Sequence, residues 1–228
     1  MRVLIDRLTG LDLGGELHLD QLRELYAVPR LPWLRANMVQ TLDGAATGAN
    51  GRTGSINNAA DKIVFDLIRS LADVIVVGAG TARAEGYEAA HVPTVLVSRV
   101  GAVPEALRTA PPGLVVMVTC AEAPALAETT DLIGRENVVV LGREAVELGA
   151  LREALVDRGH RSLLCEGGPQ LLSALLEAGE VDELCASTVP KVVGGQHPRI
   201  TGGPELDLPL ELGMLLEEGG TLLGRWLT

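Results

Sequence analysis

Short, uniformly apolar runs that begin about 20 to 25 residues apart constrain the fold of this chain more than any other feature. These runs cover residues 73–78, 93–98, 113–119, 137–141 and 162–166. Apolar segments of this length are typical of strands buried on both faces of a parallel sheet. Helical patterns lie between them, most clearly at 145–158 and 170–178. Strands that alternate with helices in this way predict an α/β fold.

Both ends of the chain depart from this alternation. We expect residues 1–31 to form a peripheral arm with a short helix, and residues 32–228 to form a single domain that opens with an extended segment. Near the C-terminus, 183–190 and 221–228 resemble strands with no clear helix between them. The sequence therefore predicts a mostly parallel sheet that finishes in antiparallel strands. Residues 210–216 would form a hairpin with the last strand, whose exposed apolar edge would need a cover.

Composition limits the partners of the chain. There are 30 acidic residues against 19 Lys and Arg, a formal net charge of -11, and only 2% of residues are aromatic. A default nucleic-acid binder needs a basic face and aromatic stacking platforms, so nucleic acid is not an expected partner. The sequence contains no signal-like N-terminus and no apolar stretch of about 18 residues, so we expect a cytoplasmic protein without a membrane segment.

The possible metal ligands are scattered along the chain. The cysteines match neither a zinc motif nor a disulfide framework, and the histidines lack metal-ligand spacing and a nearby serine elbow. These residues are Cys120, Cys165, Cys185, His18, His91, His160 and His197. The sequence therefore predicts no metal site, no zinc hydrolase and no catalytic triad.

One glycine pair joins a predicted strand directly to a predicted helix. In open α/β sheets, ligands bind beyond the carboxyl ends of the strands. Glu166 is followed there by Gly167-Gly168, and Pro169 suits the first turn of a helix. Two glycines let backbone amides approach a ligand, and a helix N-terminus favours a phosphate. This segment is either an anion site or only a tight strand-to-helix turn.

Three further strand ends carry polar residues, listed here in chain order. They are Thr41-Leu-Asp43-Gly44, Gly78-Ala-Gly80-Thr81 and Ser98-Arg99. Asp-Gly is a frequent turn, and a lone Gly-x-Gly without a third glycine is not a Rossmann fingerprint. A hydroxyl next to a guanidinium could clamp a 2′-phosphate, although surface Ser-Arg pairs are common.

Taken together, the ordered motifs of the chain resemble one family. The segments that carry the resemblance are Thr41 to Gly44, Leu67-Ile-Arg69, residues 72–85, 165–171 and 181–190, and Gly194-Gly195. They are similar to the bacterial riboflavin-biosynthesis pyrimidine reductase, a member of the dihydrofolate reductase-like superfamily. The resemblance runs from about Trp33 to the C-terminus.

The resemblance implies a dihydrofolate reductase-like three-layer fold and a homodimer. It also implies an NADPH-dependent oxidoreductase that reduces the ribosyl group of 5-amino-6-(5-phosphoribosylamino)uracil to ribityl, by hydride delivery to ribose C1. In this family the reductase domain is often fused to a zinc deaminase. The 31 residues before the resemblance are too few for that domain and its motif does not occur, so we expect none here.

The family motifs also assign site residues. Cofactor contacts are implied for Val39, Gly78, Gly80, Thr81, Glu85, Ser98, Arg99, Gly167, Gly168, Pro169, Gln170 and Leu171. Substrate contacts are implied for Thr41, Asp43, Thr53, Arg69 and Glu166. Asp43 and Glu166 are the expected catalytic groups.

The sequence departs from the family at two positions where substrate contacts are expected. Many members carry Lys or Arg where this chain has Ala45, and the Arg that grips the substrate phosphate is missing after Glu85. The alternatives are therefore a paralogue that reduces another pyrimidine or a pterin such as dihydrofolate, a non-catalytic NADPH-binding protein, and a domain whose glycine turns are purely structural.

Overall fold

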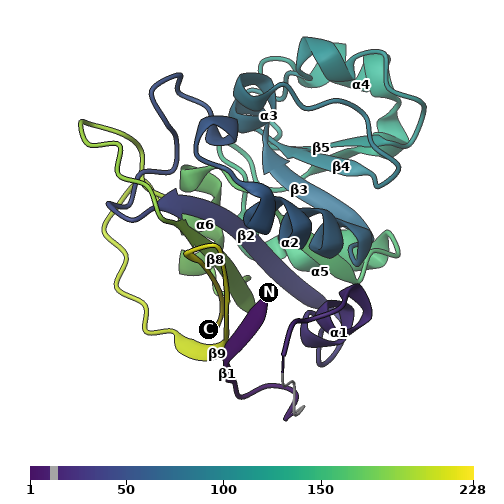
Figure 1. Cartoon of the computed structure of the whole chain (residues 1–228). Helices are drawn as coiled ribbons and strands as arrows, with labels where there is room; N and C mark the ends of the chain where they lie inside the picture. Colours follow the sequence, from purple (N-terminus) through teal and green to yellow (C-terminus); the bar gives the residue numbers. More distant parts are fainter. Residues whose placement is uncertain (11–14) are drawn as a thin grey trace.

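The computed structural model describes residues 1–10 and 15–228, and these contain one ten-stranded sheet. The strands are β1 (Arg2–Asp6), β2 (Trp33–Thr41), β3 (Val74–Gly78), β4 (Thr94–Val97), β5 (Val115–Thr119), β6 (Val138–Val140), β7 (Ser162–Cys165), β8 (Glu183–Val189), β9 (Glu211–Glu218) and β10 (Thr221–Leu227). Their order across the sheet is β1-β9-β10-β8-β2-β7-β3-β4-β5-β6. Figure 1 shows the sheet running through the whole molecule.

The helices are short and lie between the strands in sequence. They are α1 (Leu19–Leu25), α2 (Ala59–Ser70), α3 (Ala79–Glu85), α4 (Leu126–Ile133), α5 (Leu151–Asp157) and α6 (Pro169–Glu177). Single 3₁₀ turns occur at η1 (Thr53–Ser55), η2 (Glu105–Leu107), η3 (Arg135–Asn137) and η4 (Leu148–Ala150).

The predicted mostly parallel sheet is confirmed. All strands from β8 to β6 in the sheet order run parallel, whereas β10, β9 and β1 pair antiparallel. Every apolar run noted in the sequence contains a strand. Strands β3, β4, β5 and β7 have no exposed residues, as the apolar runs predict. The carboxyl ends of β2, β7, β3 and β4 consequently meet along one edge of the sheet.

Helices cover both faces of the sheet, which gives three layers (Figure 1). Leu163 and Cys165 of β7 pack in the cluster that contains α5 and α6. The residue between them, Leu164, packs on the opposite face with α1 and α2. This alternation is the period-two geometry of a strand, and it explains why both faces of the central strands are apolar.

Helix α2 forms where the sequence predicts it. The side chain of Asn58 caps its start by accepting a 3.1 Å hydrogen bond from the Asp61 amide. Val64, Leu67 and Ile68 are buried, whereas Ile63 is exposed. The helix expected at 145–158 is shorter and begins only at Leu151, because the Glu147 amide is held outside any helix by the Leu141 carbonyl at 3.1 Å.

The predicted C-terminal hairpin forms from β9 and β10, and the cover that its edge needs comes from within the chain. Strand β10 lies between β8 and β9, and β9 is covered in turn by β1 from the N-terminus. The five residues of β1 are too few to show a clear strand pattern, so the sequence placed them in a peripheral arm. With this edge covered inside the chain, the homodimer stays a prediction that rests on the resemblance alone.

Candidate active site

Two adjoining cavities lie at the carboxyl edge of the sheet. The first, about 370 Å³, is lined by Asp61, Phe65 and Arg69 of α2 and by residues of β2 and α3, and we call it the α2 pocket. The second, about 890 Å³, is lined by Pro169 to Leu171 of α6 and by the ends of β3 and β4, and we call it the α6 groove. Both are bordered by Thr81, Gly168, Pro169 and Pro198, so they adjoin there.

The α6 groove collects most of the residues predicted to contact a cofactor. These are Gly78, Gly80, Thr81, Ser98, Arg99, Gly168, Pro169, Gln170 and Leu171. Val39 and Glu85 line the α2 pocket instead. Gly167 borders neither cavity, and its carbonyl accepts a 2.8 Å hydrogen bond from the Gly78 amide. The end of β3 and the turn after β7 are thereby tied together at the border of the groove.

The glycine pair is required by close packing at the border of the cavities. Gly167 has a φ of +86°, a conformation that glycine adopts without strain. A Cβ at Gly168 would overlap the Thr81 hydroxyl. Pro169 occupies the first turn of α6, so the helix starts directly at the groove and points its free backbone amides toward it. These amides and the helix dipole favour an anion.

The charges of the groove differ from those of the whole protein. Arg99, Arg199 and His197 line the groove, and none of its lining residues in the described part of the chain is Asp or Glu. The chain carries a net charge of -11. An acid-free groove in so acidic a protein is suited to an anionic ligand. His197 and Arg199 were missed in the sequence analysis because residues 194–209 look like an ordinary turn-rich loop.

A bidentate ion pair forms one wall of the α2 pocket. Arg69 donates from Nε and Nη2 to the two carboxylate oxygens of Glu166, each at 2.6 Å. The Tyr87 hydroxyl donates to Glu166 Oε2 at 2.5 Å. The guanidinium also lies 4.4 Å from the ring centroid of Phe65. The sequence predicted Arg69 and Glu166 as substrate contacts, and the structure shows that they also hold each other.

Tyr87 was missed as a site residue, although it lies two positions after Glu85, in the stretch where the family's arginine is missing. Burial, and then the charge of Glu166, raise the pKa of Tyr87 above its ordinary value. Burial disfavours the charged form of Arg69, but its bonds to Glu166 dominate and raise the pKa of the guanidinium. Tyr87 is therefore a neutral hydrogen-bond donor and Arg69 a permanent cation at neutral pH.

Glu85 and Thr53 are joined directly. The Glu85 carboxylate accepts from the Thr53 amide at 2.9 Å and from its hydroxyl at 2.8 Å. This contact links η1 to the end of α3 across the mouth of the α2 pocket, which both residues line. The structure thus brings together one predicted cofactor contact and one predicted substrate contact.

Asp43 and Thr41 lie outside both cavities. The Thr41 hydroxyl donates to Asp43, whose carboxylate also accepts from the amides of Val193, at 3.1 Å, and Gly194, at 2.7 Å. These hydrogen bonds, that from Thr41 first, lower the pKa of Asp43. Asp43 therefore fastens the turn after β2 to the loop after β8, and its catalytic role stays a prediction.

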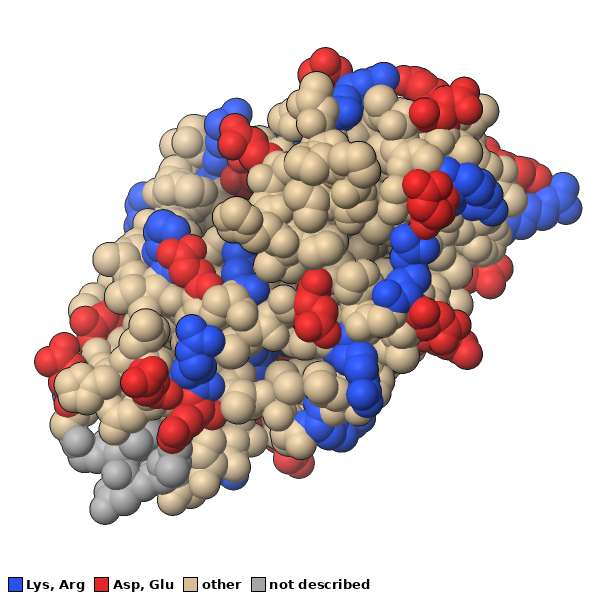
Figure 2. Space-filling view, turned by 90° about the vertical axis from the view of Figure 1, so that its right-hand side faces the viewer, with Lys and Arg blue, Asp and Glu red and all other residues tan. Residues whose placement is uncertain are grey.

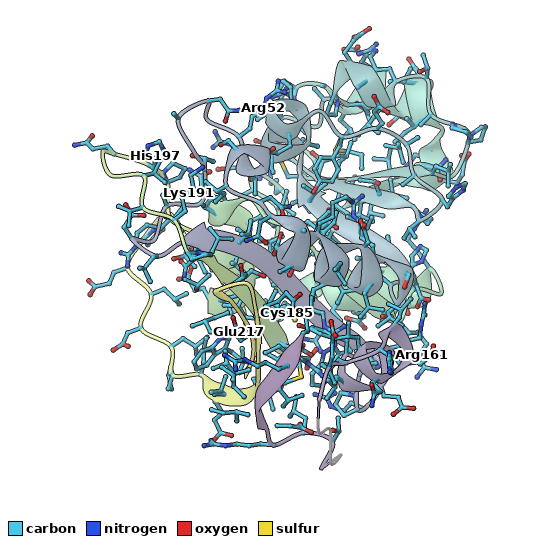
Figure 3. The ribbon with its side chains drawn as sticks, viewed as in Figure 1. Arg52, Arg161, Cys185, Lys191, His197 and Glu217 are labelled. Atoms are coloured by element: carbon cyan, nitrogen blue, oxygen red, sulfur yellow. The ribbon has the colours of Figure 1, made fainter. Side chains whose placement is uncertain are left out.

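The loops beyond β2 and β8 meet over the same edge of the sheet. Figure 3 shows Arg52, Lys191 and His197 close to one another there, far from Arg161 at the opposite end. The Lys191 ammonium donates to the Ser55 carbonyl at 2.7 Å. The loop that carries His197 and Arg199 is thus anchored to the η1 turn, between the pocket and the groove.

The described residues contain neither a metal-ligand cluster nor a membrane-spanning helix. In residues 1–10 and 15–228, no three His, Cys, Asp or Glu side chains are grouped as a metal site. In the same residues, no helix has the length and apolarity needed to span a bilayer. On the face seen in Figure 2, acidic and basic side chains are interspersed.

The fold and the two cavities define an α/β protein with two adjoining cavities at the carboxyl edge of a parallel sheet. Residues 32–219 match the family described as the RibD C-terminal domain, and the chain belongs to this family. Its curated relatives include the 2,5-diamino-6-ribosylamino-4(3H)-pyrimidinone 5′-phosphate reductase of Methanothermobacter thermautotrophicus. The two are 29% identical over 184 residues, which are 74% of this chain and 82% of that protein.

A second relative and one solved structure agree with this membership. The riboflavin biosynthesis protein RibD of Mycobacterium tuberculosis is 30% identical over 74% of this chain, but over only 44% of its own length. A pyrimidine reductase-like protein of Corynebacterium diphtheriae has the same fold, with a TM-score of 0.74, 23% identity, and coverage of 94% of this chain and 96% of that one. The predicted α/β fold, a mostly parallel sheet with antiparallel C-terminal strands, is confirmed, and the chain is related to reductases of riboflavin biosynthesis.

Proposed function

We propose that this protein is an NADPH-dependent reductase of riboflavin biosynthesis. It would reduce the ribosylamino group of a phosphorylated 6-ribosylaminopyrimidine to a ribitylamino group. The single observation that carries this proposal is the junction at Thr81 and Gly168 of an acid-free groove with a pocket that holds an ion-paired carboxylate. A dinucleotide in the groove and a pyrimidine in the pocket would then meet at this junction.

The residues of the α6 groove fit a dinucleotide phosphate. The amides at the start of α6 suit the pyrophosphate, as at other helix N-termini. Ser98 and Arg99, at the end of β4, suit a 2′-phosphate. NADPH, when bound, supplies the hydride. The protein's part is to orient the cofactor and exclude water.

The chemistry requires an imine at ribose C1. When the ribosylamine ring opens, C1 forms a double bond to the exocyclic nitrogen and the ring oxygen takes up a proton as a hydroxyl. Hydride addition to C1 and protonation of the nitrogen then give the ribitylamine. Glu166, fixed by Arg69 and Tyr87, would hold the ribosyl hydroxyls in the orientation that this step needs.

Two forms of the substrate fit this chemistry. One is 5-amino-6-(5-phosphoribosylamino)uracil, which the family resemblance implies. The other is its 2-amino counterpart, the diaminopyrimidinone named for the curated archaeal relatives. Both carry the same ribosyl phosphate and differ only in the group at C2 of the ring. An assay that follows NADPH oxidation with each substrate tests the function. Saturable NADPH binding without turnover of either would leave a non-catalytic nucleotide-binding protein instead.

Replacing Glu166 with Gln tests the role of the pocket. The variant loses the charge that holds Arg69, so we expect turnover to fall about 100-fold while the dissociation constant for NADPH changes less than about threefold. Steady-state kinetics and a fluorescence titration measure the two quantities. Glu88→Gln, at an exposed acid next to Tyr87 in the sequence, is the matched control. Normal turnover in the Glu166 variant would remove Glu166 from the mechanism.

Replacing Arg99 with Ala tests the cofactor preference. If Arg99 meets the 2′-phosphate, NADPH affinity should drop by about 10- to 100-fold, because a charge-assisted contact is lost. NADH affinity should stay the same. Arg143→Ala, at an exposed arginine outside the groove, serves as the control. An equal loss of affinity for both cofactors would mean that Arg99 does not read the 2′-phosphate.

A further inference from the structure

The interior of the α2 pocket carries more negative than positive charge. Three of its described lining residues are acids, namely Asp61, Glu85 and Glu166, and Arg69 is the one cation among them. Arg69 already gives two donors to the Glu166 carboxylate, so its charge is balanced inside the pocket. A phosphate dianion would be repelled by the remaining carboxylates. A phosphorylated ligand of this pocket must therefore keep its phosphate at the mouth.

The η1 turn and the residues before it form part of this mouth. Gly51, Thr53 and Gly54 line the pocket. Arg52, which lies among them in the sequence, is exposed. Its carbonyl accepts a 2.7 Å hydrogen bond from the Ser55 hydroxyl, which fixes the backbone from which the guanidinium extends. The Arg52 side chain is thus carried by an anchored turn at the entrance of the pocket.

Two cations lie beside η1 without an acidic partner. Among the described residues, none forms an ion pair with Arg52 or Lys191. The Lys191 ammonium is held next to the turn by its 2.7 Å bond to the Ser55 carbonyl, and its other donors are left for a ligand. Both side chains are exposed and lie toward the same end of the molecule (Figure 3). The mouth is therefore basic, although the interior is acidic.

Thr53 presents two convergent donors at this mouth. Its amide and its hydroxyl both donate to Oε1 of Glu85, at 2.9 and 2.8 Å. An anionic oxygen held by a backbone amide and a hydroxyl is bound as a phosphate oxygen can be. None of the described cations forms an ion pair with Glu85. The Glu85 carboxylate thus occupies a place that suits an anion of higher charge.

We propose that Arg52, with the amide and hydroxyl of Thr53, binds the 5′-phosphate of the substrate, and that Glu85 occupies this site until the phosphate displaces it. This inference rests on the proposed function. Lys191 adds a second positive charge beside the turn. With the phosphate at the mouth, the ribosyl chain extends inward to Glu166. The interior acids then face the uncharged part of the substrate.

The variant Arg52→Ala tests this site with two substrates that differ only in the phosphate. For the natural protein, kcat/KM should be about 100-fold higher for the ribosylaminopyrimidine phosphate than for its dephosphorylated form. In the variant this advantage should fall below about tenfold, mainly through a higher KM, because a charge-assisted contact is lost. The dephosphorylated form should be reduced equally by both proteins. An unchanged advantage would overturn the inference.

Two controls accompany this variant. Arg161→Ala, at an exposed arginine at the opposite end of the molecule, should keep the full advantage of the phosphorylated substrate (Figure 3). NADPH affinity and the melting curve should be the same in Arg52→Ala as in the natural protein. Weaker NADPH binding with the substrate advantage intact would assign Arg52 to a cofactor phosphate and overturn the inference.

Titration with ribose 5-phosphate in the absence of NADPH tests the site without turnover. Arg52→Ala should bind this probe about tenfold more weakly than the natural protein. Glu85→Ala should bind it about tenfold more tightly, because the competing carboxylate is gone. Weaker binding in Glu85→Ala would show that Glu85 does not compete for the site, and would overturn that part of the inference.

The inference and the proposed function can fail separately. If the natural protein reduces neither ribosylaminopyrimidine phosphate, but its binding of ribose 5-phosphate depends on Arg52, the function is wrong and the phosphate site is supported. If the natural protein reduces one of them and neither turnover nor probe binding depends on Arg52, the function stands and the phosphate site is refuted.

Discussion

Replacing Glu183 with Ala is expected to lower the free energy of unfolding by about 3–5 kcal/mol, which is the usual effect of removing one partner from a buried ion pair. Glu183 starts β8 and has no exposed surface. Its carboxylate accepts from Arg225 at 2.6 and 2.9 Å and from Arg35 at 3.1 Å. The Trp33 indole also donates to it, at 3.1 Å.

The large effect arises from what the substitution leaves behind. Arg35 is 4% exposed and Arg225 is 1% exposed, so two guanidinium groups would remain buried without a counter-charge. They also donate to carbonyls at the end of α1, those of Tyr26 and Leu25 respectively. Strands β2, β8 and β10 and helix α1 are therefore expected to loosen together.

Thermal unfolding measures this change. A loss of this size should lower the melting temperature by about 10 °C in a chain of this length. Glu211→Ala, at an exposed acid of neighbouring β9, is the control and should change it by less than about 2 °C. A Glu183→Ala protein with the natural melting temperature would show that the cluster does not stabilise the fold.

The same cluster predicts the pH dependence of stability. Burial by itself would raise the pKa of Glu183, but the charges and hydrogen bonds of Arg35 and Arg225 outweigh it and lower the pKa to about 2. A carboxyl with a lowered folded-state pKa stabilises the fold above its ordinary pKa of about 4.3. This stability is lost as the pH falls from there toward 2. In Glu183→Gln, denaturant unfolding between pH 5 and 2 should show a smaller loss than in the natural protein.

Replacing Gly168 with Ala is expected to weaken NADPH binding by about 10- to 100-fold. The added methyl group overlaps the Thr81 hydroxyl, and overpacking of this kind costs about 1–3 kcal/mol. Both residues border the pocket and the groove, so any shift that relieves the overlap moves the junction itself. Turnover should fall with the affinity, because the two cavities would no longer align.

A matched glycine separates this local effect from a general one. Gly149 lies in η4, and a Cβ there would meet no atom within 4 Å. Gly149→Ala should therefore bind NADPH like the natural protein. Calorimetric titration of both variants provides the comparison. Full NADPH affinity in Gly168→Ala would contradict the placement of the cofactor at this junction.

Much of the fold follows from local patterns in the sequence. Val74 to Val77 form an uninterrupted apolar run, and only a strand covered on both faces buries such a run completely. Asn58 indicates the start of α2 as its N-cap, and Pro169 indicates the start of α6 as a first-turn proline. Strand β1 is different, because Arg2–Asp6 becomes a strand only by pairing with β9, more than 200 residues later in the chain.

The candidate site likewise depends partly on local sequence and partly on contacts between distant parts of the chain. The glycine turn at 167–168 could be singled out from its place between a strand and a helix, as either an anion site or a tight turn. The bond from Tyr87 to Glu166 could not, because it joins residues 79 positions apart whose distance depends on the order β2-β7-β3 in the sheet. For Asp61, the helical pattern of α2 was visible, but not that its side chain faces a pocket.

The sequence alone therefore determined the α/β class, the parallel strands, the glycine turns at their ends and the family resemblance. Each of these is encoded by neighbouring residues, through burial periodicity and backbone freedom. Only the tertiary structure decided which strand ends meet. It paired Arg69 with Glu166 and placed Asp43 outside the two cavities. Such contacts depend on strand order, which no local pattern specifies.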